Sequence, residues 1–301
     1  MMLRLAPMMI AILVATSIDS ALSSEPSSNL QYGTPKLLGT LKNDKITESS
    51  GLAASNRHPN IFWTHNDSGD KPRLFAFDRS GKHAGTSALR GAQAIDWEDM
   101  GTFRYQDRPF LFVADTGCND LKRRNYTLYT ALEPKTPKKD TQVVHRIDFS
   151  YADKRAHNCE AVAYDPRDNQ FLLIEKRKHH QVLFPSPVWQ LNWDPTQRTQ
   201  TQIAQRIGEI RFPIVTGLDL APDGSRGFAI TYLGNGAELQ RRAGESWQTA
   251  LQRPLRTIAL PPRKQGEAVC YGNDGKTLFL TSEKKPSPFY MVPITNNTQN
   301  R

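Results

Sequence analysis

A repeat with a period near 50 residues runs through the chain and constrains its fold more than any other feature. Each copy opens with a short strand, turns at Pro, Asp, Asn or Gly, and continues into a second, apolar strand. The residues that open the five copies, here called anchors, are Ser50, Glu98, Glu160, Thr216 and Glu267, spaced 48, 62, 56 and 51 residues apart. Short strands at such a period are typical of a β-propeller, in which each repeat forms one blade.

Each copy leaves room for two more strands, enough for a four-stranded blade. Third strands are expected from residues 73, 126, 188, 237 and 289, and fourth strands over 84–89, 143–149, 202–207 and 255–260. The fifth copy lacks a fourth strand, whereas an apolar segment at 35–41 precedes the first copy. Pairing the two would remove an exposed sheet edge. We therefore predict an all-β, five-bladed β-propeller closed by an N-terminal strand; a six-bladed ring is the alternative, because the longest spacing has room for extra structure.

The chain begins with the features of a secretory signal peptide. Arg4 supplies a positive charge, residues 5–18 are mostly apolar, and 21–23 offer small residues for cleavage. The apolar stretch is short for a membrane span, and no cysteine follows it that would carry a lipid. We predict a signal peptide over 1–23, a single domain over 24–301, and a secreted or periplasmic protein without a stable membrane anchor.

The net charge of +9 indicates either a well-solvated surface or an attraction for anions. Basic residues cluster at 122–124, 176–178 and 284–285. No motif of a nucleic-acid-binding fold accompanies them, so we expect no nucleic acid as a partner. An anionic small molecule or an extracellular ligand is the expected partner, and the protein is expected to be a monomer.

In a propeller, the loop after the second strand of a blade returns to the face where the innermost strand begins. The residues 17 positions after the anchors should therefore surround one channel mouth together with the anchors. These residues are Asp67, Asp115, Arg177, Leu233 and Lys284. The mouth is expected to be acidic on one side and basic on the other.

The acidic side gathers many oxygen ligands. Its members are Glu48, His65, Asn66, Asp67, Asp70, Asp96, Glu98, Asp99, Asp115 and Asp120, with Glu160 and Glu267 across the ring. Converging carboxylates repel one another unless a proton or a cation intervenes, and hard oxygen ligands suit Ca²⁺ better than Zn²⁺. We predict Ca²⁺ ligands at Glu48, Glu98, Asp115, Glu160 and Glu267. The alternative is that Asp-Ser-Gly and Asp-Thr-Gly merely form tight turns.

Four residues are candidates for catalysis. His65 is the best candidate for a general base, and Asp67 offers a carboxylate beside it. Arg177 and Lys284 would orient an anionic group. They belong to a basic side that also contains Lys176, Lys178, His179, His180 and Lys285. The alternatives are a structural histidine and an ordinary solvated rim.

Covalent catalysis has no support in the sequence. Gly-x-Ser-x-Gly, a phosphate-binding glycine loop, Cys-x-x-Cys and His-Glu-x-x-His are all absent. The Asp-Ser-Gly and Asp-Thr-Gly pair is similar to the two turns of aspartic proteases. The two copies lie 48 residues apart, however, which equals an anchor spacing, so blade repetition explains them.

The three cysteines allow one disulfide in an oxidising compartment. Cys118 follows the second strand of the second copy, and Cys159 directly precedes the third anchor. Neighbouring blades would bring these two together at one face, so we predict a Cys118–Cys159 disulfide. Cys270 lies on an apolar strand and is expected to be a buried free thiol.

The quoted motifs resemble secreted bacterial propellers of the gluconolactonase-like, NHL-repeat and phytase-like groups. The similarity rests on the Glu-Ser-Ser-Gly-Leu opening at 48–52, residues 65–70 and 96–99, and the Glu-Ala-Val strands at 160 and 267. It implies Ca²⁺ at the channel and hydrolysis of esters, lactones or phosphoesters. Gluconolactonase-like propellers have six repeats where this chain shows five.

Two hypotheses of function follow. The first is a Ca²⁺-assisted hydrolase of an anionic ester, lactone or phosphoester. The second is a non-catalytic extracellular propeller that binds a ligand or a protein at the same mouth.

Overall fold

The computed structural model describes residues 30–177 and 185–296, and most of these residues lie in β-strands. Most strands pair antiparallel with the next in the chain, which produces successive groups of four. The first three groups are β3 (Ser49–Ala54), β4 (Ile61–Asn66), β5 (Arg73–Asp78) and β6 (His83–Arg90); β7 (Trp97–Tyr105), β8 (Arg108–Asp115), β9 (Tyr126–Leu132) and β10 (Thr141–Tyr151); and β11 (Cys159–Asp165), β12 (Gln170–Glu175), β13 (Ser186–Asn192) and β14 (Thr199–Ile210).

The last two groups follow the same plan with one difference. They are β15 (Val215–Leu220), β16 (Arg226–Thr231), β17 (Asn235–Gln240) and β18 (Arg256–Ala259), then β19 (Gln265–Tyr271), β20 (Thr277–Glu283) and β21 (Pro288–Asn296). The N-terminal strands β1 (Leu30–Tyr32) and β2 (Lys36–Thr40) both pair antiparallel with β21. The final group therefore combines the two ends of the described chain.

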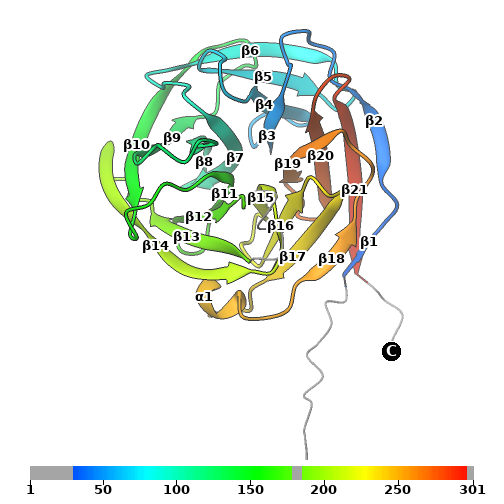
Figure 1. Ribbon diagram of the computed structural model, residues 1–301. Coiled ribbons are helices and arrows are strands. Elements are labelled where there is room, and N and C mark those ends of the chain that lie inside the picture. Colours follow the sequence, from blue (N-terminus) through cyan, green and yellow to red (C-terminus); the bar gives the residue numbers. More distant parts are fainter. Residues whose placement is uncertain (1–29, 178–184, 297–301) are drawn as a thin grey trace, which may run out of the picture.

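The first strand of each group lies nearest a common centre, and the arrangement is propeller-like (Figure 1). β3, β7, β11, β15 and β19 contact one another in that order, and β19 also contacts β3. Each of these inner strands is buried along nearly its whole length. Burial on both faces explains why their sequences lack the alternation of apolar and polar residues that marks a half-exposed strand.

The outer edges are more connected than the sequence indicated. β10 pairs in parallel with β14, matching Arg146–Tyr151 to Thr199–Ala204, and also pairs in parallel with β6 at two positions. Hydrogen bonds thus join the first three groups into one continuous sheet at their rims.

Large aromatic side chains fill the space between neighbouring groups. Phe62 of the first group packs on Phe279 of the last, with ring centroids 4.5 Å apart. Phe103 of the second group stacks on Tyr164 of the third at 3.9 Å. Burial of apolar area is the main driving force for folding, and aromatic pairs also have preferred orientations that fix how neighbouring groups pack.

Buried carboxylates connect the inner strands at the centre. The Asp99 carboxylate on β7 accepts hydrogen bonds from the backbone N–H of Val162 on β11 at 2.9 Å and of Leu218 on β15 at 3.2 Å. Asp219 on β15 likewise accepts the N–H of Tyr271 on β19 at 2.7 Å. These bonds satisfy buried backbone donors and fix the inner strands relative to one another.

The predicted Cys118–Cys159 disulfide is wrong, because both residues are free thiols. The two segments do adjoin, since Thr116 donates to the Cys159 carbonyl at 2.7 Å. The sulfurs, however, have different partners: Cys118 Sγ accepts the Arg123 N–H at 3.1 Å, and Cys159 Sγ accepts the Tyr151 hydroxyl at 3.0 Å. Cys270 is a buried free thiol, as expected.

The helix α1 (Trp247–Ala250) is a single turn between β17 and β18. Within the described ranges, no helix has the length and apolarity needed to cross a membrane.

The close packing at the centre makes Gly51 intolerant of a side chain. A Cβ there would lie 2.5 Å from His65 Nε2 and 2.7 Å from the Met100 backbone nitrogen. We expect Gly51→Ala to lower the free energy of unfolding by at least about 2 kcal/mol, measured by urea denaturation. The control is Gly208→Ala, where the nearest atom would be Leu251 Cδ1 at 3.3 Å and the change should stay within about 1 kcal/mol. Equal effects would show that the centre is not tightly packed.

Candidate functional site

Every inner strand carries a β-bulge at its anchor residue, and these bulges are the local origin of the site. The strand pairing shifts register between Ser49 and Leu52, Trp97 and Asp99, Cys159 and Ala161, Val215 and Gly217, and Gln265 and Ala268. An extra residue at a bulge leaves the ladder and has its side chain re-aimed. All five bulges lie at the strand starts, and this end of the channel is called the mouth below.

Three carboxylates meet at the mouth. Asp67 follows β4, Asp96 precedes β7, and Glu98 occupies the bulge of β7. One oxygen from each lies within 4.8 Å of the others. Glu98 is 3% exposed, and its Oε1 has no hydrogen-bond partner among the described residues. This set is called the acid cluster below.

Gly117 makes room for the acid cluster. A Cβ at this position would collide with Glu98 Oε1 and with the Asp96 carboxylate. Its backbone N–H donates to the Asp96 carbonyl at 3.1 Å. The glycine of the Asp-Thr-Gly sequence therefore allows two carboxylates to approach the backbone.

Burial and mutual repulsion raise the pKa of every member of the acid cluster. Burial, then the carboxylates of Glu160 and Asp67, raise the pKa of Glu98 well above its usual range. Burial, followed by Glu283 and Asp96, raises the pKa of Asp67 to about 7. Burial likewise raises the pKa of Asp96. Such a site gains stability by taking up protons or a cation.

A second polar group lies beside the acid cluster and is centred on Lys176. Its ammonium is paired with Glu160, donates to the Tyr232 hydroxyl at 2.6 Å and lies 4.0 Å from Glu267 Oε1. Tyr232 in turn donates to Glu267. Although burial alone would lower the pKa of Lys176, the Glu160 carboxylate raises it, so the lysine is charged.

Glu267 and Glu283 complete the mouth. Burial and then the adjacent Glu283 raise the pKa of Glu267 far above its usual range. Glu283 is 3% exposed; its Oε2 accepts from Gln265 at 2.7 Å, and its Oε1 has no hydrogen-bond partner within the described ranges. The sequence analysis missed Glu283, although it lies one position before Lys284 and ends its strand.

The five predicted metal ligands lie in different parts of the mouth and do not form one ligand set. Glu98 belongs to the acid cluster, whereas Glu160 and Glu267 surround Lys176. Asp115 pairs with Arg123 at 2.6 Å and accepts the Asp96 N–H at 3.1 Å, so it positions Asp96. Glu48 is half-buried and forms a backbone bridge to Glu283.

The four catalytic candidates also differ in placement. Asp67 lies in the acid cluster. His65 is fully buried, and its Nδ1–H donates to the Asn66 carbonyl at 2.9 Å. Arg177 is half-buried, with Nε 3.9 Å from Glu175 Oε2, and Lys284 is exposed. Residues 178–180, which include two histidines of the expected basic side, lie outside the described residues.

A cleft of about 710 Å³ adjoins the acid cluster: it is lined by Asp96, which belongs to the cluster, and by Gly117. Its wall also contains Ile95, Lys122 and Arg124. The cleft therefore offers exposed cations next to the carboxylates, on the second group and not on the later groups where the sequence analysis expected them.

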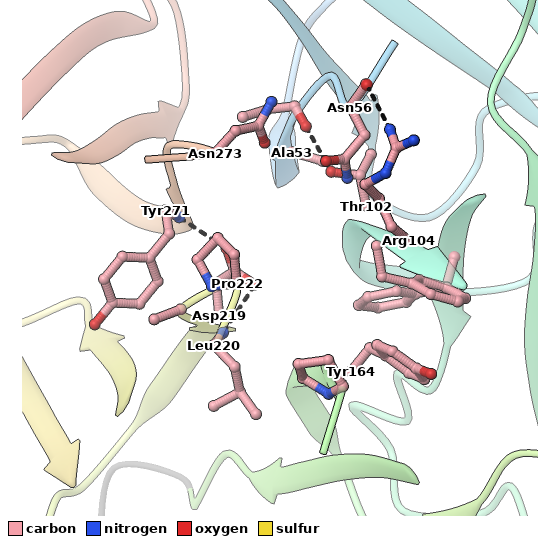
Figure 2. A pocket seen from close by; sticks show the side chains of 15 residues that line it. Ala53, Asn56, Thr102, Arg104, Tyr164, Asp219, Leu220, Pro222, Tyr271 and Asn273 are labelled. Carbon is pink, nitrogen blue, oxygen red and sulfur yellow. Dashed lines mark hydrogen bonds between the residues drawn. The ribbon is translucent and has the colours of Figure 1, made fainter. Parts of the chain in front are cut away.

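A separate pocket of about 370 Å³ occupies the opposite end of the channel (Figure 2). Residues from the ends of all five inner strands line it, among them Thr102, Tyr164, Asp219 and Asn273. Burial raises the pKa of Asp219 to about 7. The sequence analysis assigned no role to this end.

No model of a known protein family and no curated protein matches the chain. Among solved structures, the hydrazine synthase of Kuenenia stuttgartiensis is similar over 84% of this chain and 72% of its own, with a TM-score of 0.45 and 9% identity. A similarity this low says nothing about activity. The function must therefore be argued from the site itself.

The burial of His65 gives a direct test of the mouth. Burial lowers its pKa to about 4, so the ring is neutral with its proton on Nδ1. Between pH 6.5 and 4 the unfolded chain binds the proton and the folded chain does not, so acid should remove up to about 3 kcal/mol of stability. Nitrogen-15 NMR of the imidazole at pH 5.5 should show the neutral tautomer. Titration near pH 6.5 would contradict the burial of this ring.

Proposed function

We propose that the chain is an exported five-bladed β-propeller whose mouth binds Ca²⁺ and hydrolyses an anionic ester, lactone or phosphoester. The five groups of strands would be the blades, and β2 would close the ring by pairing with β21. The contact of β19 with β3 supports this closure.

One observation carries the metal site: Glu98 Oε1 is buried and unpartnered, and a carboxylate oxygen of Glu98 lies within 4.8 Å of oxygens from Asp67 and Asp96. A buried acceptor without a donor is costly, and a cation would satisfy it. The donors are all hard oxygens, which fits Ca²⁺. Turn chemistry, the simpler alternative, does not explain a carboxylate left without a donor.

Asp67, Asp96 and Glu98 would hold the ion, and Asp115 with Arg123 would position the loop that carries Asp96. When bound, Ca²⁺ supplies a positive charge that polarises a carbonyl or phosphoryl oxygen.

The chain's own groups would handle the proton. Tyr232 sits between Lys176, which donates to its hydroxyl, and Glu267, which accepts from it. The ammonium of Lys176 stabilises negative charge on its neighbours, while burial and the adjacent Glu283 raise the pKa of Glu267 and favour its protonated form. Such a pair is suited to general acid–base catalysis beside the ion.

The adjoining cleft supports an anionic substrate. It places Lys122 and Arg124 beside Asp96, so a group bound there would reach the ion while its negative charge faces these cations. This replaces Arg177 and Lys284 as the residues expected to orient the anion.

A non-catalytic binding propeller is the second candidate, and the opposite pocket favours it. That pocket combines aromatic and aliphatic walls with the Asp219 carboxyl, a composition typical of small-molecule sites. In that case the ion at the mouth would be structural.

Calcium titration by calorimetry tests the metal site. The wild type, stripped with a chelator, should bind one Ca²⁺ at the mouth. Glu98→Gln should weaken binding by roughly tenfold or more, because it replaces a direct ligand. Asp120→Asn is the matched control, since this exposed carboxylate lines the adjoining cleft but is outside the acid cluster, and its loss should leave the affinity unchanged. Equal affinity in the wild type and Glu98→Gln would refute the site.

Turnover then separates the two functions. We would assay nitrophenyl esters, lactones and nitrophenyl phosphates with Ca²⁺ and with chelator. Hydrolysis should need Ca²⁺, be lost in Glu98→Gln, and fall by about 10²-fold in kcat for Tyr232→Phe. Calcium binding without hydrolysis of any of these substrates would favour the non-catalytic reading.

A further inference from the structure

We infer that the mouth face docks on an anionic lipid surface. The inference is separate from the proposed calcium site, because it rests on side chains that lie outside the acid cluster and the Lys176 group. It shares Lys122 and Arg124 with the cleft proposed to orient the anionic substrate. It concerns the loops that follow the second strand of each group and those that lead into the inner strands, which are called the mouth loops below.

Exposed cations dominate the mouth loops. They include Lys45, Lys71, Lys122, Arg124, Lys264, Lys284 and Lys285. The exposed carboxylates on the described part of these loops are Asp44, Asp120 and Asp153. The rim of the mouth is therefore basic, although its centre is acidic.

The ion pairs on this rim are weak. Lys122 lies 3.3 Å from Asp120 with both side chains more than half exposed, and Lys285 lies 3.6 Å from a fully exposed Asp44. Pairs this exposed contribute little and are screened by salt. Lys122 thus remains available to an anionic surface, while Lys264 and Lys285 also donate to the backbone carbonyls of Lys285 and Asp44.

Exposed aliphatic side chains lie among these cations. Of the five large apolar residues that are exposed in the described chain, Ile95, Leu121 and Leu233 lie on mouth loops; Leu37 and Ile203 lie on outer strands. The three are 56%, 50% and 58% exposed. Exposed apolar residues that gather on one face mark interaction surfaces, whereas singly scattered ones do not, so we take these three together with the cations around them as the docking face.

The exposed apolar side chains lie close in the sequence or in the cleft to exposed cations. Leu121 directly precedes Lys122, and Ile95 lines the same cleft as Arg124. Leu233 follows Tyr232 across the mouth. Ile95 and Leu121 therefore lie among the exposed cations of the second group, and Leu233 lies on the loop that follows β16.

A lipid surface explains both features together. Basic residues are attracted to anionic headgroups, and aliphatic tips enter the boundary between headgroups and acyl chains. A soluble polyanion would use the cations but leave the aliphatic side chains in water. Single-stranded nucleic acids are bound with aromatic platforms, which the exposed residues in the described part of these loops do not provide.

Co-sedimentation with vesicles tests the inference. The protein, purified from the exported fraction, should bind phosphatidylcholine–phosphatidylglycerol vesicles and not pure phosphatidylcholine vesicles, with chelator present. Lys122→Ser with Arg124→Ser should weaken binding about thirtyfold, since each cation contributes about fivefold. Leu121→Ser with Leu233→Ser should weaken it about a hundredfold, or tenfold for each side chain.

The matched control removes two exposed cations far from the mouth. Lys135 and Lys138 lie on the loop between β9 and β10, whose Glu133 bonds to Ser55 at the other end of the inner strands. Lys135→Ser with Lys138→Ser makes the same change in net charge and should leave vesicle binding unaltered. Circular dichroism of each variant confirms its fold.

Three results would overturn the inference. The first is that the mouth variants and the control variant lose vesicle binding equally. The others are that the protein binds heparin but no vesicles, or that replacing Leu121 and Leu233 leaves vesicle binding unchanged. Glu98→Gln should bind vesicles like the wild type, so loss of calcium binding and loss of docking are separate outcomes.

Discussion

The crowding of buried carboxylates at one end of the channel is the constraint on which the rest depends. Among the described residues, Asp67, Asp96, Glu98, Glu160, Glu267 and Glu283 share this space with one largely buried lysine, Lys176. Burial disfavours the ionised form of each carboxylate, and each ionised carboxylate disfavours the ionisation of its neighbours. The chain as a whole is strongly basic, so this acidity is local and is not a product of composition. Lys176 neutralises part of the group, and Glu98 remains without a donor.

The inner strands both bring the carboxylates together and contain the hydrogen bonds that stabilise this arrangement. Five bulges, one on each inner strand, bring the anchors to the mouth. There Glu98, Glu160 and Glu267 lie among the carboxylates, while Ser50 and Thr216 donate to backbone carbonyls of neighbouring inner strands. Further along the same strands, Asp99 and Asp219 accept backbone N–H groups from neighbouring groups and hold the centre together. Small residues such as Gly51 let the strands approach closely. The bulges are costly in ladder hydrogen bonds, which is the usual sign of a strand shaped for function.

Much of this was predictable because a propeller repeats. The spacing of the anchors was enough to bring Glu98, Glu160 and Glu267 to one end, and the strand patterns were enough to place nearly every strand. Side-chain direction was not predictable, because a shift of one residue reverses it and a bulge supplies such a shift. For that reason the sequence did not predict that Asp96, and not Asp115, belongs to the acid cluster. It also did not predict the pairing of Lys176 with Glu160 or the presence of Glu283 at the mouth. The same limit explains the cysteines, whose segments adjoin while their sulfurs point to different partners.

The most direct test of the central claim is a crystal structure grown with Ca²⁺, with anomalous scattering used to locate the ion. The account predicts one peak at about 2.3–2.6 Å from oxygens of Asp67, Asp96 and Glu98, with Glu98 Oε1 among the ligands. Absence of a peak there, with Glu98 Oε1 hydrogen-bonded to a protonated Asp96 or to ordered water, would contradict it. The crowding would then be relieved by protons alone.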